Sequence, residues 1–148
     1  MDKAQTTANI TFQMKRTFQA PRAKVFRAWT DRTELAQWFA PSAEYSTFVP
    51  ELELRVGGRY RVEMHHKGGK VHGVSGTYQE IKPPEKVVFT WRWDGDAAPE
   101  HTVVTVEFQD LGNSTEVTLT HECLPNPEER GKHAHGWNGC LDQLAKFL

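Results

Sequence analysis

Two histidines are the residues whose type and position could do chemistry. His121 ends a run in which Val117, Leu119 and His121 alternate with polar residues, and His133 precedes Trp137 at helical spacing. A strand turns every second residue to one face and a helix every third or fourth, so both imidazoles are predicted to point into one apolar space. There they could orient a ligand or move a proton, although a single inward histidine is more often a hydrogen-bonded core residue. Both interpretations stay open.

The other histidines do not form a recognisable metal site. His65 and His66 are adjacent, so they point to opposite faces of a strand, and with His72 they flank a glycine-lysine turn in which no carboxylate or cysteine completes a ligand set. His133 and His135 are two apart and turn away from each other on a helix. The sequence also has no Gly-x-Ser-x-Gly elbow, phosphate-binding glycine loop or dinucleotide fingerprint. We therefore expect no metal and no cofactor, and the sequence names no catalytic residue.

Hydrophobic periodicity predicts the strands that would carry these side chains. Apolar and polar residues alternate at 10–18, 59–64, 87–93, 104–108 and 117–121, and another strand is expected to run through Tyr78 and Ile81. Glycine-rich turns at 67–70 and at Gly112 favour hairpins between neighbouring strands. The stretch between Pro41 and Arg59 is expected to be irregular.

Helix-start signals predict two short helices and one long one. Pro21 suits a first helical position, and Asp31 with Glu34 resembles a capping box ahead of a second helix that Pro41 ends. Asn126 is the expected cap of the closing helix, which carries an apolar stripe of His133, Trp137, Leu141, Leu144 and Leu148. Hairpin-linked strands with few helices favour an α+β fold, an antiparallel sheet with helices on one face.

Length and composition narrow the class of protein. The 148 residues suit one domain, expected at 10–148 after a flexible N-terminus at 1–9. The 18 basic and 19 acidic residues nearly cancel, which argues against binding to nucleic acid or to an anionic membrane. Cys123 and Cys140 make no disulfide framework, and no apolar stretch is long enough for a signal sequence or membrane span. The sequence therefore predicts a cytoplasmic protein.

The order of these segments resembles a known family. The resemblance covers nearly the whole chain and is carried by Ala20-Pro21, 25–30, Leu35 and Trp38, Arg55 with Gly57-Gly58, 76–78 leading to 88–91, 119–122, and Gly136-Trp137 with Leu141 and Leu144. It is similar to the START-like (SRPBCC) superfamily and, within it, to the C-terminal domain of the activator of heat-shock protein 90 ATPase. The resemblance implies a helix-grip fold, in which about seven antiparallel strands wrap around the long C-terminal helix and two short helices follow the first strand.

That fold also implies an internal cavity, which superfamily members use for lipids, polyketides and other small hydrophobic molecules. Large aromatic residues dominate ordinary cores as well, so the role of each one alone is expected to be packing. As a set, on the strength of the resemblance, we expect the cavity to be lined by Trp38, Phe39, Tyr78, Phe89, Trp91, Trp93, His121, His133, Trp137 and Leu141.

Three functions follow as hypotheses from different classes. The first is a binding module for a small hydrophobic molecule such as a lipid, polyketide or aromatic compound. The second is a co-chaperone-like interaction domain, although the co-chaperone of that name has a separate N-terminal chaperone-binding domain that is not expected here. The third is a cyclase- or hydrolase-like enzyme that uses a cavity histidine. A homodimer is compatible with a fold that has exposed sheet edges, but no heptad pattern specifies one.

Overall fold

A computed structural model of the chain describes residues 10–95 and 101–148. The N-terminal segment that was predicted to be flexible, residues 1–9, lies outside the described residues. The described elements, in chain order, are β1 (Ile10–Phe18), α1 (Arg22–Thr30), α2 (Arg32–Trp38), β2 (Tyr45–Leu52), β3 (Arg59–His66), β4 (Val71–Lys82), β5 (Lys86–Trp93), β6 (Thr102–Asp110), β7 (Thr115–Leu124) and α3 (Pro127–Phe147). Within these ranges, no helix combines the length and the hydropathy that crossing a membrane requires.

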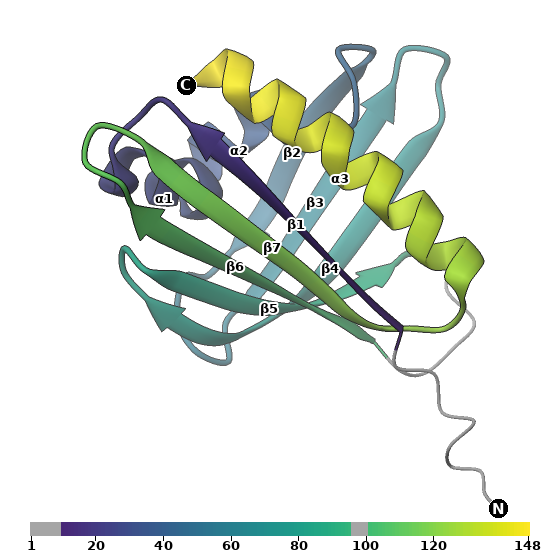
Figure 1. Ribbon diagram of the computed structural model, residues 1–148. Helices are drawn as coiled ribbons and strands as arrows, with labels where there is room; N and C mark the ends of the chain where they lie inside the picture. Colours follow the sequence, from purple (N-terminus) through teal and green to yellow (C-terminus); the bar gives the residue numbers. More distant parts are fainter. Residues whose placement is uncertain (1–9, 96–100) are drawn as a thin grey trace, which may run out of the picture.

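The strands form one sheet in the order β1-β7-β6-β5-β4-β3-β2, and every neighbouring pair is antiparallel. Figure 1 shows the sheet curving around α3, which runs diagonally across one face, while α1 and α2 lie together near one end of the sheet. The predicted α+β helix-grip architecture, with seven strands, two short helices after the first strand and a long closing helix, is confirmed.

Strand β2 replaces the irregular stretch that was expected between Pro41 and Arg59. Among the described strands it pairs only with β3, at the edge of the sheet, and its register shifts between Phe48 and Glu51, around Pro50. Proline lacks the N–H that a central strand needs, so it is tolerated at an edge, and the shift breaks the two-residue alternation. Both features hide this strand from a search for periodicity.

The helix caps form as the sequence predicted, with one small difference. The Asn126 side chain accepts a hydrogen bond from the Glu129 N–H at 2.8 Å, and Asp31 accepts one from the Glu34 N–H at 3.0 Å. Pro21 is the N-cap of α1, one position before the place expected for it. These caps fix the residues at which α2 and α3 begin.

Helix α3 is attached to the sheet by both apolar and polar contacts. Trp137, Leu141 and Leu144 of the predicted stripe are buried. Arg16, on the inward side of β1, donates to Asp142 Oδ1 and to Asn138 Oδ1, each at 2.6 Å. The guanidinium therefore has the carboxylate partner that its position on an apolar strand face requires.

Candidate functional site

A pocket of about 230 Å³ opens where α3 crosses the sheet beside the end of α2. Most of its wall is apolar, and the polar side chains sit on the first turns of α3. The lining residues are Phe39, Pro41, Met64, Trp91, Trp93, Glu129, Lys132, His133, Gly136, Trp137 and Cys140. Its size is somewhat below the roughly 300–1,000 Å³ of typical ligand pockets, so it suits a small molecule.

A second, much smaller space lies deeper between the short helices and the sheet, and we call it the inner cavity. It has a volume of about 20 Å³ and is lined by Trp29, Leu35, Phe39, Tyr60, Val62, Tyr78, Phe89 and Trp91. Two of these residues, Phe39 and Trp91, also line the pocket. The two spaces therefore share a wall that consists of side-chain rings.

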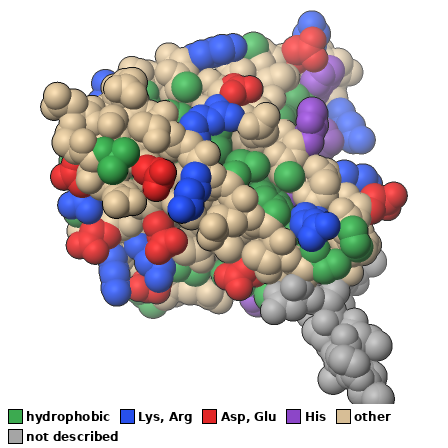
Figure 2. All heavy atoms as spheres, viewed as in Figure 1, with side chains coloured by type: hydrophobic (Ala, Val, Ile, Leu, Met, Phe, Trp, Pro, Cys, Tyr) green, Lys and Arg blue, Asp and Glu red, His purple; other side chains and the backbone are tan. Residues whose placement is uncertain are grey.

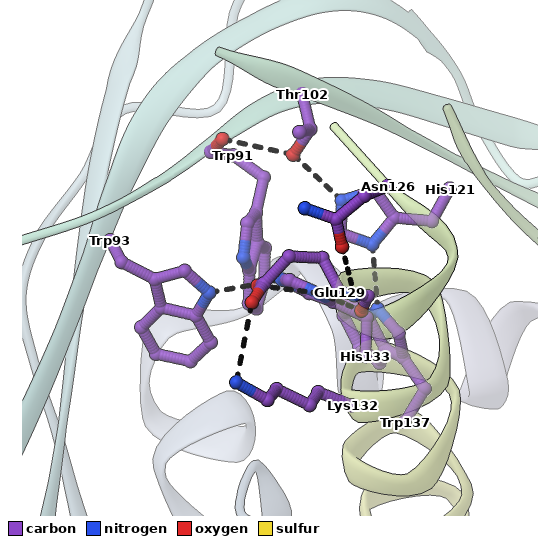
Figure 3. Close-up of polar contacts among 9 residues, drawn as sticks. All are labelled: Trp91, Trp93, Thr102, His121, Asn126, Glu129, Lys132, His133 and Trp137. Carbon is purple, nitrogen blue, oxygen red and sulfur yellow. Dashed lines mark hydrogen bonds and ion pairs between the residues drawn. The ribbon is translucent and has the colours of Figure 1, made fainter. Parts of the chain in front are cut away.

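His121 of β7 is held in a chain of hydrogen bonds that begins on α3 (Figure 3). Trp137 donates its indole N–H to His121 Nδ1 at 3.0 Å. Since Nδ1 accepts, the ring proton is on Nε2, which donates to Thr102 Oγ1 at 2.7 Å. The Thr102 hydroxyl in turn donates to the backbone carbonyl of Trp91 at 3.1 Å. His121 is fully buried, and both of its ring nitrogens are occupied.

His133 of α3 repeats the same pattern with the opposite tautomer. Trp93 donates its indole N–H to His133 Nε2 at 3.0 Å, and His133 Nδ1 lies 2.8 Å from the backbone carbonyl oxygen of Glu129. Because that carbonyl can only accept, Nδ1 carries the proton. Each histidine thus accepts from one tryptophan and donates to one oxygen.

The two imidazoles lie close together, as their sequence periodicity predicted, and meet edge to face with ring centroids 4.9 Å apart. Burial, together with the nearby His133, lowers the pKa of His121 from 6.5 to about 3. An imidazole that is neutral and hydrogen-bonded at both nitrogens has no lone pair with which to abstract a proton. In this arrangement both histidines position the tryptophans that wall the pocket.

The five tryptophans differ in whether their indole N–H has an acceptor. Trp38 donates to the Ala28 carbonyl at 2.8 Å, and Trp93 and Trp137 donate to the two histidines. The indole nitrogens of Trp29 and Trp91 are buried and have no hydrogen-bond partner among the described residues. Buried polar groups are nearly always paired, so these two donors need a physical explanation.

The mouth of the pocket carries an ion pair. Lys132 Nζ lies 3.4 Å from Glu129 Oε2, and both side chains project from the first turns of α3 beside the pocket (Figure 3). Asn126 caps this helix end through the Glu129 N–H. The Glu129 carboxylate lies at the positive end of the helix dipole, which stabilises the capped first turn. The backbone carbonyl of Glu129 in the same turn accepts from His133 Nδ1 and so orients its ring.

The structure distributes the predicted site residues over three places. Phe39, Trp91, Trp93, His133 and Trp137 border the pocket, with Phe39 and Trp91 also bordering the inner cavity. Tyr78 and Phe89 border only the inner cavity.

Trp38, Leu141 and His121 border neither space. His121 supports the pocket from behind through Trp137. The Trp38 ring packs edge-on against Trp29, with centroids 4.9 Å apart, and Leu141 is 1% exposed within the core. These two side chains contribute packing within the hydrophobic core.

Several pocket residues were not anticipated from the sequence. Met64 comes from β3, and Gly136, Cys140, Glu129 and Lys132 come from α3. The α3 residues that border the pocket occupy positions 129, 132, 133, 136, 137 and 140, which is the three- and four-residue spacing of one helix face. That signal could have identified them once His133 and Trp137 were placed on the cavity side.

The histidines near the β3–β4 turn lie apart from this site. His65 contacts Glu63 at 3.2 Å, and His66 contacts Glu44 at 3.3 Å. His72 lies edge-on to Trp93, with centroids 6.4 Å apart. Among the described residues, no three metal-ligating side chains come together.

Comparisons with known proteins agree with this fold. A family model described as "Activator of Hsp90 ATPase homolog 1-like protein" matches residues 19–148. The human protein "Activator of 90 kDa heat shock protein ATPase homolog 1" is 29% identical over 132 residues, which are 88% of this chain and 34% of that protein. The mouse protein of the same name is 28% identical over 133 residues with the same coverage. The chain thus spans about a third of the length of the curated relatives it matches.

Solved structures give the same result. A crystal structure of a protein from Chromobacterium violaceum has a TM-score of 0.81 at 30% identity, covering 94% of this chain and 97% of that one. The AHSA1 protein of Silicibacter pomeroyi has a TM-score of 0.80 at 28% identity, covering 93% of this chain and 96% of that one. The chain therefore belongs to the family of activator of Hsp90 ATPase homolog 1-like proteins, as the order of its sequence segments indicated.

Proposed function

We propose that this chain binds a small hydrophobic molecule in the pocket between α3 and the sheet. The observation that carries the proposal is an apolar pocket of about 230 Å³ that the surrounding side chains leave unfilled, although three tryptophans border it. Burial of apolar ligand surface against such walls supplies the binding free energy. The volume favours a molecule about the size of a bicyclic aromatic compound or a short acyl chain.

The state of the histidines favours binding over catalysis. A general base needs a free lone pair near its substrate, and a general acid needs a pKa near the working pH. His121 and His133 each use one nitrogen to accept from a tryptophan and the other to donate to an oxygen. The described residues at the pocket thus give more support to a rigid binding site than to proton transfer.

Filling the pocket from α3 tests the proposal. Gly136 borders the pocket, and a Cβ added there would meet no atom within 4 Å, so Gly136→Leu should fold and place its side chain in the ligand space. Gly131→Leu is the matched control, because Gly131 lies on the same helix, is equally unobstructed and does not border the pocket. Binding of 2-isopropenylnaphthalene, followed by tryptophan fluorescence, should weaken at least roughly tenfold in Gly136→Leu only. Equal affinity in both variants and the wild type would contradict the proposal.

Native mass spectrometry of the freshly purified chain gives independent support. A small hydrophobic molecule that co-purifies with the wild type and with Gly131→Leu, but is lost in Gly136→Leu, would occupy the same pocket. Extraction under denaturing conditions would then give its chemical identity.

A second candidate function is contact with a heat-shock chaperone, and it rests on the names of the human and mouse relatives. The face shown in Figure 2 has acidic and basic side chains interspersed, with apolar side chains in small groups. The large exposed apolar residues among those described are Phe48 of β2, Leu54 and Val56 between β2 and β3, Val71 of β4, Leu111 after β6 and Phe147 of α3. Stimulation of the ATPase activity of a 90-kDa heat-shock protein by this chain would support this second function. The absence of stimulation at a saturating concentration of the chain would rule it out.

A further inference from the structure

The two unpartnered indole N–H groups indicate what kind of ligand fits the site. Three of the five tryptophans have acceptors within the protein, whereas the buried nitrogens of Trp29 and Trp91 have none in the part of the chain that the structure describes. Both residues are at least nine-tenths buried, with exposed fractions of 4% and 5%. A buried donor without an acceptor loses its hydrogen bond to water and gains nothing in exchange. A bound group with an acceptor atom would restore the hydrogen bond that each indole N–H loses on burial.

Both tryptophans border the inner cavity, so the side chains that carry the two donors meet at one space. Its volume of about 20 Å³ exceeds the roughly 10–15 Å³ that one water-sized group needs. A carbonyl oxygen has two lone pairs and can therefore accept from two N–H groups at once. The inner cavity thus has the size for a single acceptor atom, and its lining includes the two tryptophans whose N–H groups have no acceptor among the described residues.

The wall between the two spaces shows how a ligand would reach these donors. Phe39 and Trp91 border both the pocket and the inner cavity, and Phe39 is the cap residue at the end of the short helix α2. A molecule seated in the pocket therefore contacts two side chains that also border the deeper space. Joining the two volumes requires the Phe39 ring, which packs against Trp91 and Trp137, to move.

The charge of the lining decides between a neutral and an anionic acceptor. None of the described residues that border the inner cavity is Lys, Arg or His. A carboxylate would lose its hydration there without gaining a counter-charge, whereas a neutral carbonyl would lose much less. Lys132 is at the outer mouth of the pocket, where Glu129 already pairs with it. A neutral oxygen is therefore the acceptor that suits the deep end.

Resting on the proposed function, we infer that the ligand is an aromatic molecule with a neutral carbonyl group. Its apolar body lies against Trp93, Trp137 and Met64 in the pocket. Its carbonyl oxygen enters the inner cavity and accepts hydrogen bonds from the indole N–H groups of Trp91 and Trp29. Ketones, esters, amides and quinones with a small aromatic body belong to this class.

Two probes of nearly equal shape test the inference on the full chain. 2-Acetylnaphthalene carries the carbonyl, and 2-isopropenylnaphthalene replaces the oxygen by a methylene group. We expect the ketone to bind roughly tenfold more tightly, the effect of one or two hydrogen bonds to otherwise unpaired donors. In ¹⁵N-tryptophan-labelled protein, assigned by Trp→Phe variants, the ketone should move the Nε1–H signals of Trp91 and Trp29 downfield relative to the alkene. The signals of Trp38, Trp93 and Trp137, which already have acceptors, should not distinguish the probes.

Variants and outcomes separate this inference from the proposed function. Trp91→Phe keeps a ring and removes the donor, so it should abolish most of the preference for the ketone, while Trp38→Phe, which borders neither space, should keep it. Equal binding of both probes with an unmoved Trp91 signal would overturn the carbonyl assignment and leave the pocket in place; this is the result expected if a buried water satisfies the donors. Failure of both probes to bind would instead overturn the proposed function.

Discussion

Trp137 donates its indole N–H to Nδ1 of His121 at 3.0 Å, and this contact joins helix α3 to strand β7 behind the pocket. The histidine can accept only while Nδ1 is unprotonated, so the contact depends on the neutral imidazole. The Trp137 ring forms part of the pocket wall, and its partner is fully buried. The charge state of His121 is therefore linked both to stability and to the shape of the site.

Acidification should destabilise the fold through His121. Its pKa is about 3 in the folded protein and 6.5 in the reference state, so the unfolded chain binds the proton more tightly. The contribution of neutral His121 to the free energy of unfolding is fully present above about pH 6.5 and is lost as the pH falls toward 3. Between pH 7 and pH 5 the free energy of unfolding should drop by about 2 kcal/mol from this group, measured by urea denaturation. The titratable side chain that faces His121 is His133, across the helix–sheet contact.

The control is His121→Gln, whose amide can accept from Trp137 and donate to Thr102 without titrating. This variant should lose most of the dependence on pH between 7 and 5. His72, whose pKa is also lowered, chiefly by burial, contributes with the same sign in both proteins and is removed by the comparison. An unchanged dependence on pH in His121→Gln would show that the histidine is not the titrating group.

The two histidines should show opposite tautomers in solution. Nδ1 of His121 accepts from Trp137, whereas Nδ1 of His133 faces the carbonyl of Glu129 and must donate. Long-range ¹H–¹⁵N spectra of the imidazoles at pH 7 should therefore identify His121 as the Nε2–H form and His133 as the Nδ1–H form. Identical tautomers at the two positions would contradict the hydrogen-bond pattern of one of the tryptophans.

The sequence was sufficient to predict that His121 and His133 lie close together, because two independent periodicities agreed. A strand period placed the first, a helix period placed the second, and the rings lie 4.9 Å apart. Which nitrogen pairs with which tryptophan depends on how α3 is positioned over β5 and β7. No local pattern encodes that offset, so the two indole–imidazole pairs could not be read from the sequence.

Two other features show where periodicity fails. Trp38 lies on a helix of seven residues, which is too short for its apolar spacing to distinguish the side toward Trp29 from the side toward the pocket. In β4 the register shifts between Tyr78 and Glu80, and this places Tyr78 and Ile81, three apart, in contact with the same core. The fold follows from repeated patterns, whereas the site depends on single irregular positions.

Removing the guanidinium of Arg16 should loosen α3 from β1. Arg16 donates to Asp142 and Asn138, and its side chain is 27% exposed, so solvent screens the contact only in part. Arg16→Met should lower the free energy of unfolding by roughly 1 kcal/mol, and Arg16→Lys should recover only part of it, since one ammonium group cannot reproduce the planar fork. Lys15→Met, on the opposite face of the same strand, is the control and should change stability little. Urea denaturation in low and high salt measures each effect, and equal losses at positions 15 and 16 would contradict the assignment.

Two glycines of α3 should respond to alanine in opposite directions. Glycine lowers helix stability by about 1 kcal/mol relative to alanine, so Gly131→Ala, at a position with no atom near the added Cβ, should stabilise the protein by up to that amount. At Gly139 the added Cβ would overlap the backbone carbonyl of Pro41, so the helix must move away from the segment that follows α2. The cost of such overpacking is about 1–3 kcal/mol and should exceed the gain in propensity.

The same movement should reach the pocket, because Pro41 and Trp137 both border it. Gly139→Ala should therefore weaken binding of 2-isopropenylnaphthalene, and Gly131→Ala should leave it unchanged. Thermal unfolding and fluorescence titration on the two variants check both effects. If Gly139→Ala were as stable as Gly131→Ala, α3 could not lie against Pro41 as closely as it does here. If it were destabilised but bound the probe normally, the pocket would not depend on that contact.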